Sequence, residues 1–187
     1  AVYWYLKYFI SYCDIEELLQ ERGVDVDHLT LQSWVVKYTP MVEANFRKKK
    51  RTVGRSWRMD ETYIKIKGQW YYLYRAVDKE GNTIDFLLTK KRDTKAAKRF
   101  LIKAIGSNRR PEKITIDKSG ANKAAIEEYN RENETSIEIR QIKYLNNIVE
   151  QDHRGIKRIT KHMLGFKSFH SASITLNGIE LVRMLKK

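Results

Sequence analysis

Hydrophobic residues before residue 45 recur at intervals of three and four, which is the period of an amphipathic helix. This pattern predicts three short helices, over about residues 2–10, 15–22 and 28–38. Gly23 favours a helix end, and Asp27 is a good N-cap for the third helix. The positions that carry the pattern are Ile15, Leu18, Leu19, Leu31, Trp34, Val35 and Tyr38.

From Trp57 onward the pattern changes to runs rich in Tyr, Ile, Val and Trp, which are typical of strands. Three such runs cover residues 57–67, 69–78 and 83–90, and turn signals at Lys67-Gly68 and in "DKEGN" separate them. Strands joined by short loops predict an antiparallel meander. Helices and strands then alternate, so the order βββαβαβα predicts an α/β domain with a mixed five-stranded sheet and flanking helices. The later elements are expected from about Thr94 to Ile105, at 113–117, at 121–132, at 136–142, at 147–163 and from Ser171.

The helices before residue 45 have helix-turn-helix spacing, with a tight turn around Gly23. Any small three-helix bundle gives the same pattern, so DNA binding and simple packing both remain open. We expect a helix-turn-helix-like region over 1–46, a basic linker over 47–56 and the α/β domain over 57–187.

The chain has 37 Lys and Arg against 23 Asp and Glu, a formal net charge of +14. Such an excess favours a polyanionic partner, most naturally nucleic acid, although a basic protein that binds no polyanion remains the alternative. The stretch "RKKKRTVGR" predicts a linker that lies on phosphates, or else a solvated linker. Its candidate DNA-binding residues are Lys48, Lys49 and Lys50.

Several classes of protein are disfavoured by the sequence. Cys13 is the single cysteine, so no intramolecular disulfide or Cys-rich zinc site is expected. No apolar run approaches the ~20 residues that span a membrane. The first residues lack a basic leader and a cleavage site, so a signal peptide is not expected. We therefore expect a cytoplasmic protein with no membrane partner.

Three carboxylates stand where an open α/β sheet forms its ligand crevice. Asp60 lies in the first strand and Asp117 ends the fourth, which should lie beside the first. Glu150 lies in the first turn of the helix after the fifth strand. Gathered together, three carboxylates need a cation, and Mg²⁺ takes such oxygen ligands while keeping waters for substrate phosphates. Two such ions would suit phosphodiester chemistry.

Each of these residues also has a structural interpretation. Asp60 is able to pair with a strand cation, Asp117 to make an Asx turn, and Glu150 to complete a capping box. Asp152 is the weakest rival ligand because it falls on the apolar side of its helix with Val149 and Ile156, and His153 is expected to be a surface or DNA-facing residue. The carboxylates that compete with the trio as ligands are Glu61, Asp78, Asp85 and Asp152.

One face of the helix expected at 147–163 is basic after its first turn. Glu150, Arg154, Lys157 and Lys161 follow at steps of four, three and four, so they share this face, and Arg158 adds to the basic set. A carboxylate followed by a basic ridge suits a phosphate-backbone substrate, while an ordinary amphipathic surface helix is the alternative. The opposite, apolar face carries Val149, Ile156, Ile159 and Met163.

Four motifs together give the sequence a family resemblance. "MDETYIK", "RAVD", "ITIDK" and "QIKYLNNIVEQDH" resemble the DDE-type bacterial insertion-sequence transposases, in particular the group called insertion sequence six. The resemblance runs from about Tyr5 to Lys187. It implies a ribonuclease-H-like fold shared with retroviral integrases, and it maps the catalytic, metal-binding trio onto Asp60, Asp117 and Glu150. Lys157 matches the basic residue that the superfamily places near the DNA end.

The resemblance also implies an activity and partners. A DDE transposase uses Mg²⁺ or Mn²⁺, with two ions expected, to cut a strand at each element end and join the freed 3′-hydroxyl to target DNA. The partners would be the terminal inverted repeats, bound by the N-terminal helices, and the target DNA. Pairing two ends implies a homodimer or a higher oligomer. The alternatives are a catalytically impaired DNA-binding remnant, or a nuclease that cuts without joining.

Overall fold

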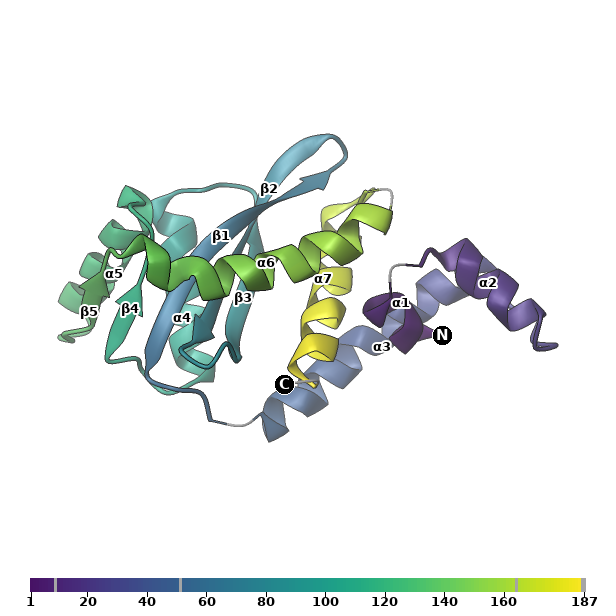
Figure 1. Cartoon of the computed structure of the whole chain (residues 1–187), viewed down its shortest axis with the longest axis horizontal. Helices are drawn as coiled ribbons and strands as arrows, with labels where there is room; N and C mark the ends of the chain where they lie inside the picture. Colours follow the sequence, from purple (N-terminus) through teal and green to yellow (C-terminus); the bar gives the residue numbers. More distant parts are fainter. Residues whose placement is uncertain (9, 51, 164, 186–187) are drawn as a thin grey trace. The chain divides into compact units, whose positions relative to one another are not determined.

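The computed structural model describes residues 1–8, 10–50, 52–163 and 165–185 (Figure 1). By the contacts within it, the chain groups into two compact units, and each of them is discontinuous in sequence. The helical unit contains Ala1–Lys50, Lys65–Gly68 and Arg154–Lys187, and the sheet unit contains Arg51–Ile64 and Gln69–His153. Neither unit is one continuous stretch of the chain. The division into regions 1–46, 47–56 and 57–187 therefore remains a prediction about function.

The sheet has five strands in the order β3-β2-β1-β4-β5, as predicted for a mixed sheet. β2 pairs with β3 in antiparallel fashion, while β4 runs parallel to both β1 and β5. β1 and β2 are consecutive and joined at Lys67-Gly68, where both residues have positive φ, a conformation that suits a tight turn. The strands are β1 (Ser56–Ile66), β2 (Gln69–Asp78), β3 (Thr83–Thr89), β4 (Lys113–Thr115) and β5 (Glu138–Arg140).

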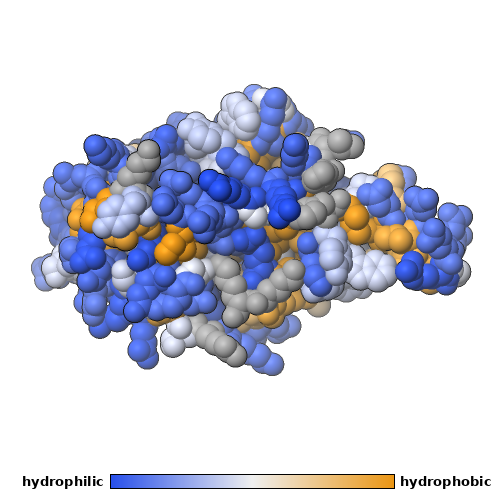
Figure 2. Space-filling model, in the orientation of Figure 1, coloured by the Kyte–Doolittle hydropathy of each residue, from blue (hydrophilic) through white to orange (hydrophobic). Residues whose placement is uncertain are grey.

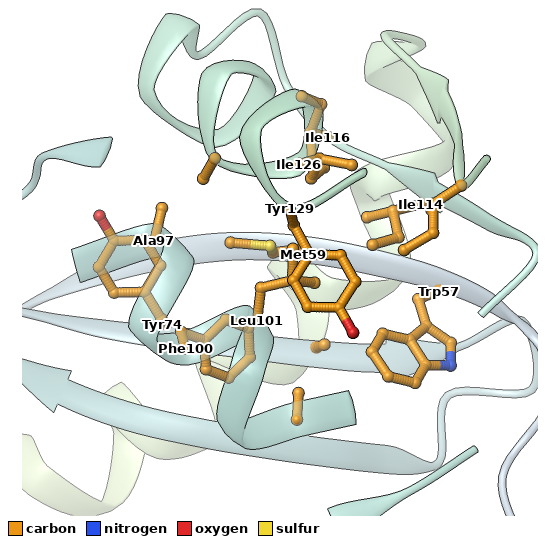
Figure 3. Close-up of a cluster of buried hydrophobic side chains, with 14 of the residues drawn as sticks. Trp57, Met59, Tyr74, Ala97, Phe100, Leu101, Ile114, Ile116, Ile126 and Tyr129 are labelled. Carbon is orange, nitrogen blue, oxygen red and sulfur yellow. The ribbon is translucent and has the colours of Figure 1, made fainter. Parts of the chain in front are cut away.

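Two helices of the sheet unit, α4 (Thr94–Ser107) and α5 (Gly120–Glu132), contribute apolar side chains to the core of the sheet. Asp93 caps α4 by accepting a hydrogen bond from the amide of Ala96 at 2.8 Å. Figure 3 shows this core, in which rings from β1 and β2 meet aliphatic side chains from β4 and the helices. Tyr74 stacks on Phe100 with ring centroids 5.9 Å apart. Burial of these residues fixes β1 beside β4, and this pairing positions the candidate site.

The predicted long helix is present, as α6 (Asn147–Thr160), preceded by the 3-10 turn η1 (Lys143–Asn146) and followed by η2 (Lys161–Met163). Its buried and exposed positions alternate as the sequence pattern predicts. The exposed residues are Glu150, Gln151, Arg154, Lys157, Arg158 and Lys161, and the buried ones are Val149, Asp152, His153, Ile156 and Ile159.

The helical unit contains α1 (Val2–Lys7), α2 (Tyr12–Gln20), α3 (His28–Lys49) and α7 (Phe169–Met184). α7 packs on α1 and α3. A Cβ at Gly178 would lie 2.6 Å from the side chain of Leu6, so glycine at this position allows close helix packing. Asn177 donates to Glu43 at 2.9 Å, which adds a polar contact between α7 and α3.

α3 is much longer than the predicted helix over 28–38. Asp27 caps it as expected, but it continues through Pro40 to Lys49. Proline interrupts the helix ladder by lacking an N–H, and here the packing of α3 against α7 compensates. Lys48 and Lys49 are therefore helical rather than part of a linker, Lys50 follows the helix end, and Arg51 lies outside the described residues.

Candidate active site

The parallel pairing of β1 with β4 places the first two candidate carboxylates in neighbouring segments. Arg58 is opposite Thr115 in this register, and Asp60 and Asp117 each follow two residues later. The charges of both carboxylates raise the pKa of Glu61, so both lie near that side chain. Asp117 follows the end of β4, where loops of α/β sheets bind ligands.

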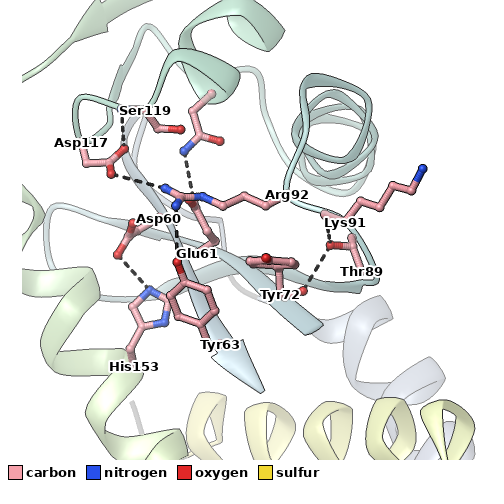
Figure 4. A network of polar contacts seen from close by, with 11 residues as sticks. Asp60, Glu61, Tyr63, Tyr72, Thr89, Lys91, Arg92, Asp117, Ser119 and His153 are labelled. Carbon is pink, nitrogen blue, oxygen red and sulfur yellow. Dashed lines mark hydrogen bonds and ion pairs between the residues drawn. The ribbon is translucent and has the colours of Figure 1, made fainter. Parts of the chain in front are cut away.

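A cation from the loop after β3 joins two acidic residues at this place (Figure 4). Arg92 makes an ion pair with Glu61 through Nε, and its Nη2 lies 3.9 Å from Asp117 Oδ2. Glu61 also accepts a 2.9 Å hydrogen bond from Asn122 of α5. Burial raises the pKa of the Glu61 carboxyl, the charges of Asp60 and Asp117 raise it further, and Asn122 and Arg92 oppose this shift. The loop cation therefore lies where negative charge gathers.

Asp117 makes the Asx turn that the sequence allowed. The amide of Ser119 donates to Asp117 Oδ1 at 2.9 Å, just before α5 begins. Its side chain remains 40% exposed. One oxygen of Asp117 thus orients the loop, while the carboxylate as a whole stays accessible to a ligand.

His153 contacts Asp60, and the expectation of a surface histidine is wrong. His153 is only 5% exposed, and its Nε2 lies 3.4 Å from Asp60 Oδ2. The reason is helical spacing: Val149, Asp152, His153 and Ile156 form the i, i+3, i+4, i+7 stripe that faces inward. The position of His153 on that stripe therefore accounts for its burial.

Glu150 lies one helical turn before His153, and its side chain is exposed. Residues three apart on a helix are neighbours, with Cβ atoms ~5–6 Å apart, so Glu150 stands beside the residue that contacts Asp60. The first turns of α6 are anchored by a buried ion pair between Arg75 of β2 and Asp152, with 2.5 Å between Nη2 and Oδ2. This anchor fixes the side of α6 on which Glu150 stands.

Three of the rival carboxylates are engaged in structural contacts. Asp78 accepts four hydrogen bonds at the β2–β3 turn, Asp85 pairs with Lys103 of α4, and Asp152 pairs with Arg75. The fourth rival, Glu61, holds Arg92 and Asn122. The prediction that Asp152 is the least suitable ligand agrees with its burial.

The carboxylate oxygens of Asp60 and Asp117 are the donors that Mg²⁺ or Mn²⁺ prefers. Within the part of the chain that the structure describes, no group of three or more His, Cys, Asp or Glu side chains already has the spacing of a metal site. Asp60 and Asp117 thus belong to one charged network. Among the described residues, Glu150 is not part of a preformed cluster of three metal ligands. The donor set fits a hard divalent cation chemically.

Comparison with known proteins decides the family. The model of a family described as the DDE domain matches residues 54–187. A transposase for the insertion sequence-like element IS431mec of Staphylococcus aureus is 43% identical over 189 residues, covering 100% of this chain and 83% of the relative. The chain belongs to the DDE transposases of insertion sequences. A second Staphylococcus aureus transposase, for element IS257 in transposon Tn4003, is 42% identical over the same shares of both chains.

Solved structures agree with the transposase in fold. The HTLV-2 integrase catalytic core, in a trimeric form with magnesium, matches with a TM-score of 0.55 and 19% identity, covering 70% of this chain and 85% of that one. The BIV integrase core matches with a TM-score of 0.52 and 17% identity, covering 67% and 82%. These matches confirm the ribonuclease-H-like fold implied by the sequence.

The candidate DNA-binding residues of the transposase lie on its surface. Arg154, Lys157, Arg158 and Lys161 are all exposed on α6 and η2. Lys48 and Lys49 are exposed in the last turn of α3, and Lys50 is partly exposed. Most of the face seen in Figure 2 is hydrophilic, in keeping with the basic composition.

Gly155 in α6 has a structural explanation. A Cβ there would lie 1.9 Å from Nη1 of Arg183, so in this arrangement the guanidinium from α7 occupies the space that a side chain at position 155 would take. Glycine in a helix interior costs about 1 kcal/mol relative to alanine, and this contact accounts for its use.

Sequence reasoning missed Arg92 as a site residue. It lies in a run of three basic residues between the buried end of β3 and the cap of α4. A loop in that position of an α/β sheet borders the ligand crevice, so the order of elements already indicated that Arg92 lies near the site.

Among the residues that the structure describes, no helix of the transposase is long and apolar enough to cross a membrane.

Proposed function

We propose that the transposase cleaves and transfers DNA strands with Asp60, Asp117 and Glu150 as its catalytic trio. The observation that supports this proposal is the parallel pairing of β1 with β4, in which Arg58 is opposite Thr115 and a candidate carboxylate follows two residues later in each segment. Glu150 completes the trio from the exposed side of an anchored helix, one turn from the histidine that contacts Asp60. Residues with purely structural contacts do not fit this role, because their oxygens are already engaged.

The trio would hold Mg²⁺ or Mn²⁺, and two ions are the proposed number. When bound, such ions supply a lowered pKa of water and neutralisation of charge on the leaving oxygen. The chain's own residues orient the ligands. His153 holds Asp60 through their 3.4 Å contact, and the Ser119 amide holds Asp117 through one oxygen.

The reaction consists of two displacements at phosphorus. In the first, the oxygen of water forms a bond to the phosphorus at the element end while the bond to the 3′-oxygen breaks, which frees a 3′-hydroxyl. In the second, that hydroxyl forms a bond to a phosphorus of target DNA, and the bond from that phosphorus to its own 3′-oxygen breaks. Each step makes one P–O bond and breaks one, so no covalent enzyme intermediate is needed.

The DNA partners proposed are the terminal inverted repeats and the target DNA. Arg154, Lys157, Arg158 and Lys161 form a basic ridge that continues along α6 and η2 from Glu150. Phosphates neutralised by this ridge would release counterions, which would strengthen DNA binding. Lys48, Lys49 and Lys50 would bind phosphates elsewhere on the same DNA, and the N-terminal helices would recognise the repeats. Because two ends must be joined, we propose a homodimer or a higher oligomer acting at the nucleoid.

The test is strand transfer of an inverted-repeat oligonucleotide into plasmid DNA with Mg²⁺ or Mn²⁺. Asp60→Asn, Asp117→Asn and Glu150→Gln should each abolish cleavage and transfer while leaving DNA binding in place. The matched control is Glu127→Gln, at an exposed position on α5 outside the trio. Undiminished activity in Asp60→Asn would refute the proposal. Salt-sensitive DNA binding by the unaltered protein with no nicking under any divalent ion would instead identify an inactive remnant.

A further inference from the structure

Three aromatic side chains lie together on the β1–β2 pair, and the least exposed of them, Tyr72, also packs against the core. Tyr63 of β1 meets Trp70 of β2 edge to face, with ring centroids 6.1 Å apart, and meets Tyr72 at 5.3 Å. Trp70 and Tyr72 are two apart on one strand, so both face the same side of the sheet. We name these three residues the aromatic patch.

The aromatic patch is unusual in its exposure. Trp70 is 58% exposed and Tyr63 is 45% exposed, whereas Tyr74, the next residue on the same side of β2, is fully buried. Exposed ring surface does not gain the free energy of burial, which is roughly 25 cal/mol per Å². Exposed rings in contact with one another on a rigid sheet are typical of a surface that binds a partner.

The patch is connected to the candidate active site through Arg92. Nη1 of Arg92 donates to the hydroxyl of Tyr63 at 3.4 Å, while the same guanidinium contacts Glu61 and Asp117. Figure 4 shows Tyr63 and Tyr72 beside Arg92. A ligand lying on Tyr63 would therefore lie next to the residue that contacts Asp117.

Two basic residues follow Thr89, the residue that pairs with Tyr72 in the β2–β3 register. Lys90 and Lys91 are exposed in the loop that follows β3. Thr89, paired in register with Tyr72, holds this loop by donating to the carbonyl of Lys91 at 2.8 Å. Rings for bases combined with cations for phosphates are the two elements of a surface that binds single-stranded nucleic acid.

We propose that the aromatic patch, with Lys90 and Lys91, binds unpaired bases of the DNA strand that enters the active site. This inference rests on the proposed function, because it assigns a strand of the same substrate to a second surface. Stacking tolerates any base, so the patch recognises that a DNA end is unpaired rather than its sequence. The transposase thus gains affinity for ends whose terminal pairs have opened, the form in which the scissile phosphate is accessible.

The test measures binding without divalent ions, so that it is independent of catalysis. The probes are a fully paired duplex end and the same end with three unpaired nucleotides, each carrying 2-aminopurine in the terminal position. The unaltered protein should bind the unpaired end more tightly. Trp70→Leu and Tyr63→Leu should weaken that binding by roughly 5- to 150-fold per stacked base, with less than about a twofold change for the paired end.

Two further variants are the controls. Phe169→Leu removes an aromatic ring of nearly equal exposure at the start of α7 and should change neither affinity, and Tyr63→Phe should keep the preference because the ring remains. Equal losses for both probes, or no loss for either, would overturn the inference. So would loss of self-association, measured by sedimentation, as the sole effect of Trp70→Leu, because the patch would then bind a second copy. Metal-dependent nicking by the unaltered protein is scored separately, so failure of the proposed function leaves the binding result readable.

Discussion

Two acidic regions of the sheet unit differ in how their carboxylates are surrounded. At the β2–β3 turn, both oxygens of Asp78 accept hydrogen bonds, from Gly54, Glu80 and twice from Asn82, and the side chain is buried. Where β1 meets β4, Asp117 accepts one amide hydrogen bond and is 40% exposed, with a cation 3.9 Å away. A buried carboxylate whose oxygens all accept hydrogen bonds stabilises the fold. A carboxylate that accepts one hydrogen bond and remains exposed is available to bind a ligand.

The largest expected effect separates these two regions directly. Asp117→Asn should reduce strand transfer by on the order of 10³-fold or more, because ligation of a catalytic ion contributes several kcal/mol to the transition state. Asp78→Asn should instead cost about 1–3 kcal/mol of unfolding free energy, since buried donors lose their acceptor. The measurements are strand transfer per folded molecule and urea unfolding. If Asp78→Asn abolished the chemistry and Asp117→Asn only lowered stability, the comparison would be reversed.

Breaking the anchor of α6 comes next in size. Asp152→Ala leaves the fully buried Arg75 without this counter-charge and should destabilise the protein by about 3–5 kcal/mol. Chemical denaturation measures the loss, and Glu127→Ala, an exposed change on α5, should stay within about 0.5 kcal/mol. A loss equal to that of the control would show that the ion pair does not anchor the helix.

Arg92→Gln tests whether the cation beside Asp117 competes with a metal ion for that carboxylate. The guanidinium competes with any cation for Asp117, and a partly exposed pair of this kind contributes about 0.2–1 kcal/mol. Removing it should strengthen Mn²⁺ binding by about 2- to 5-fold, measured by electron paramagnetic resonance of the free ion. Arg99→Gln, an exposed position on α4, is the matched control. Weaker Mn²⁺ binding in Arg92→Gln would mean that the arginine supports the metal site instead of competing with it.

The smallest effect concerns the basic ridge. Lys157→Ala should weaken DNA binding uniformly across sequences and lower the slope of log K against log salt by about one. Lys123→Ala removes an exposed lysine on α5 and should leave the slope unchanged. A titration of binding against salt between about 50 and 200 mM separates the two outcomes. An unchanged slope in Lys157→Ala would take that residue off the DNA path.

Much of the fold was predictable because its signals are local. Runs rich in Tyr, Ile, Val and Trp, together with the turn signals at Lys67-Gly68 and in "DKEGN", defined β1 to β3 within a residue or two. The parallel strands β4 and β5 are shorter than predicted, because only three residues of each pair with a neighbour. The predicted end of the third helix was wrong. Proline disfavours a helix interior, but packing against α7 allows α3 to continue through Pro40.

The candidate site was predictable only in part. Strand order alone placed β1, which contains Asp60, beside β4, which precedes Asp117, and the inward stripe of α6 could have shown that His153 is buried. Arg92 could not be assigned to Glu61 and Asp117 from sequence, because that contact joins three separate segments through tertiary packing. The choice of metal ligands and DNA-binding residues stays a prediction.

The packing of α7 against α1 and α3 has a consequence for biosynthesis. These N-terminal helices leave the ribosome early, yet the helix that covers them begins about 120 residues after α3 ends. At roughly 5–20 residues per second, they wait about 6–24 s for that partner. During this interval the apolar face of α3 has no cover from α7. The order of synthesis therefore delays completion of the helical unit until the sheet and α6 have already been made.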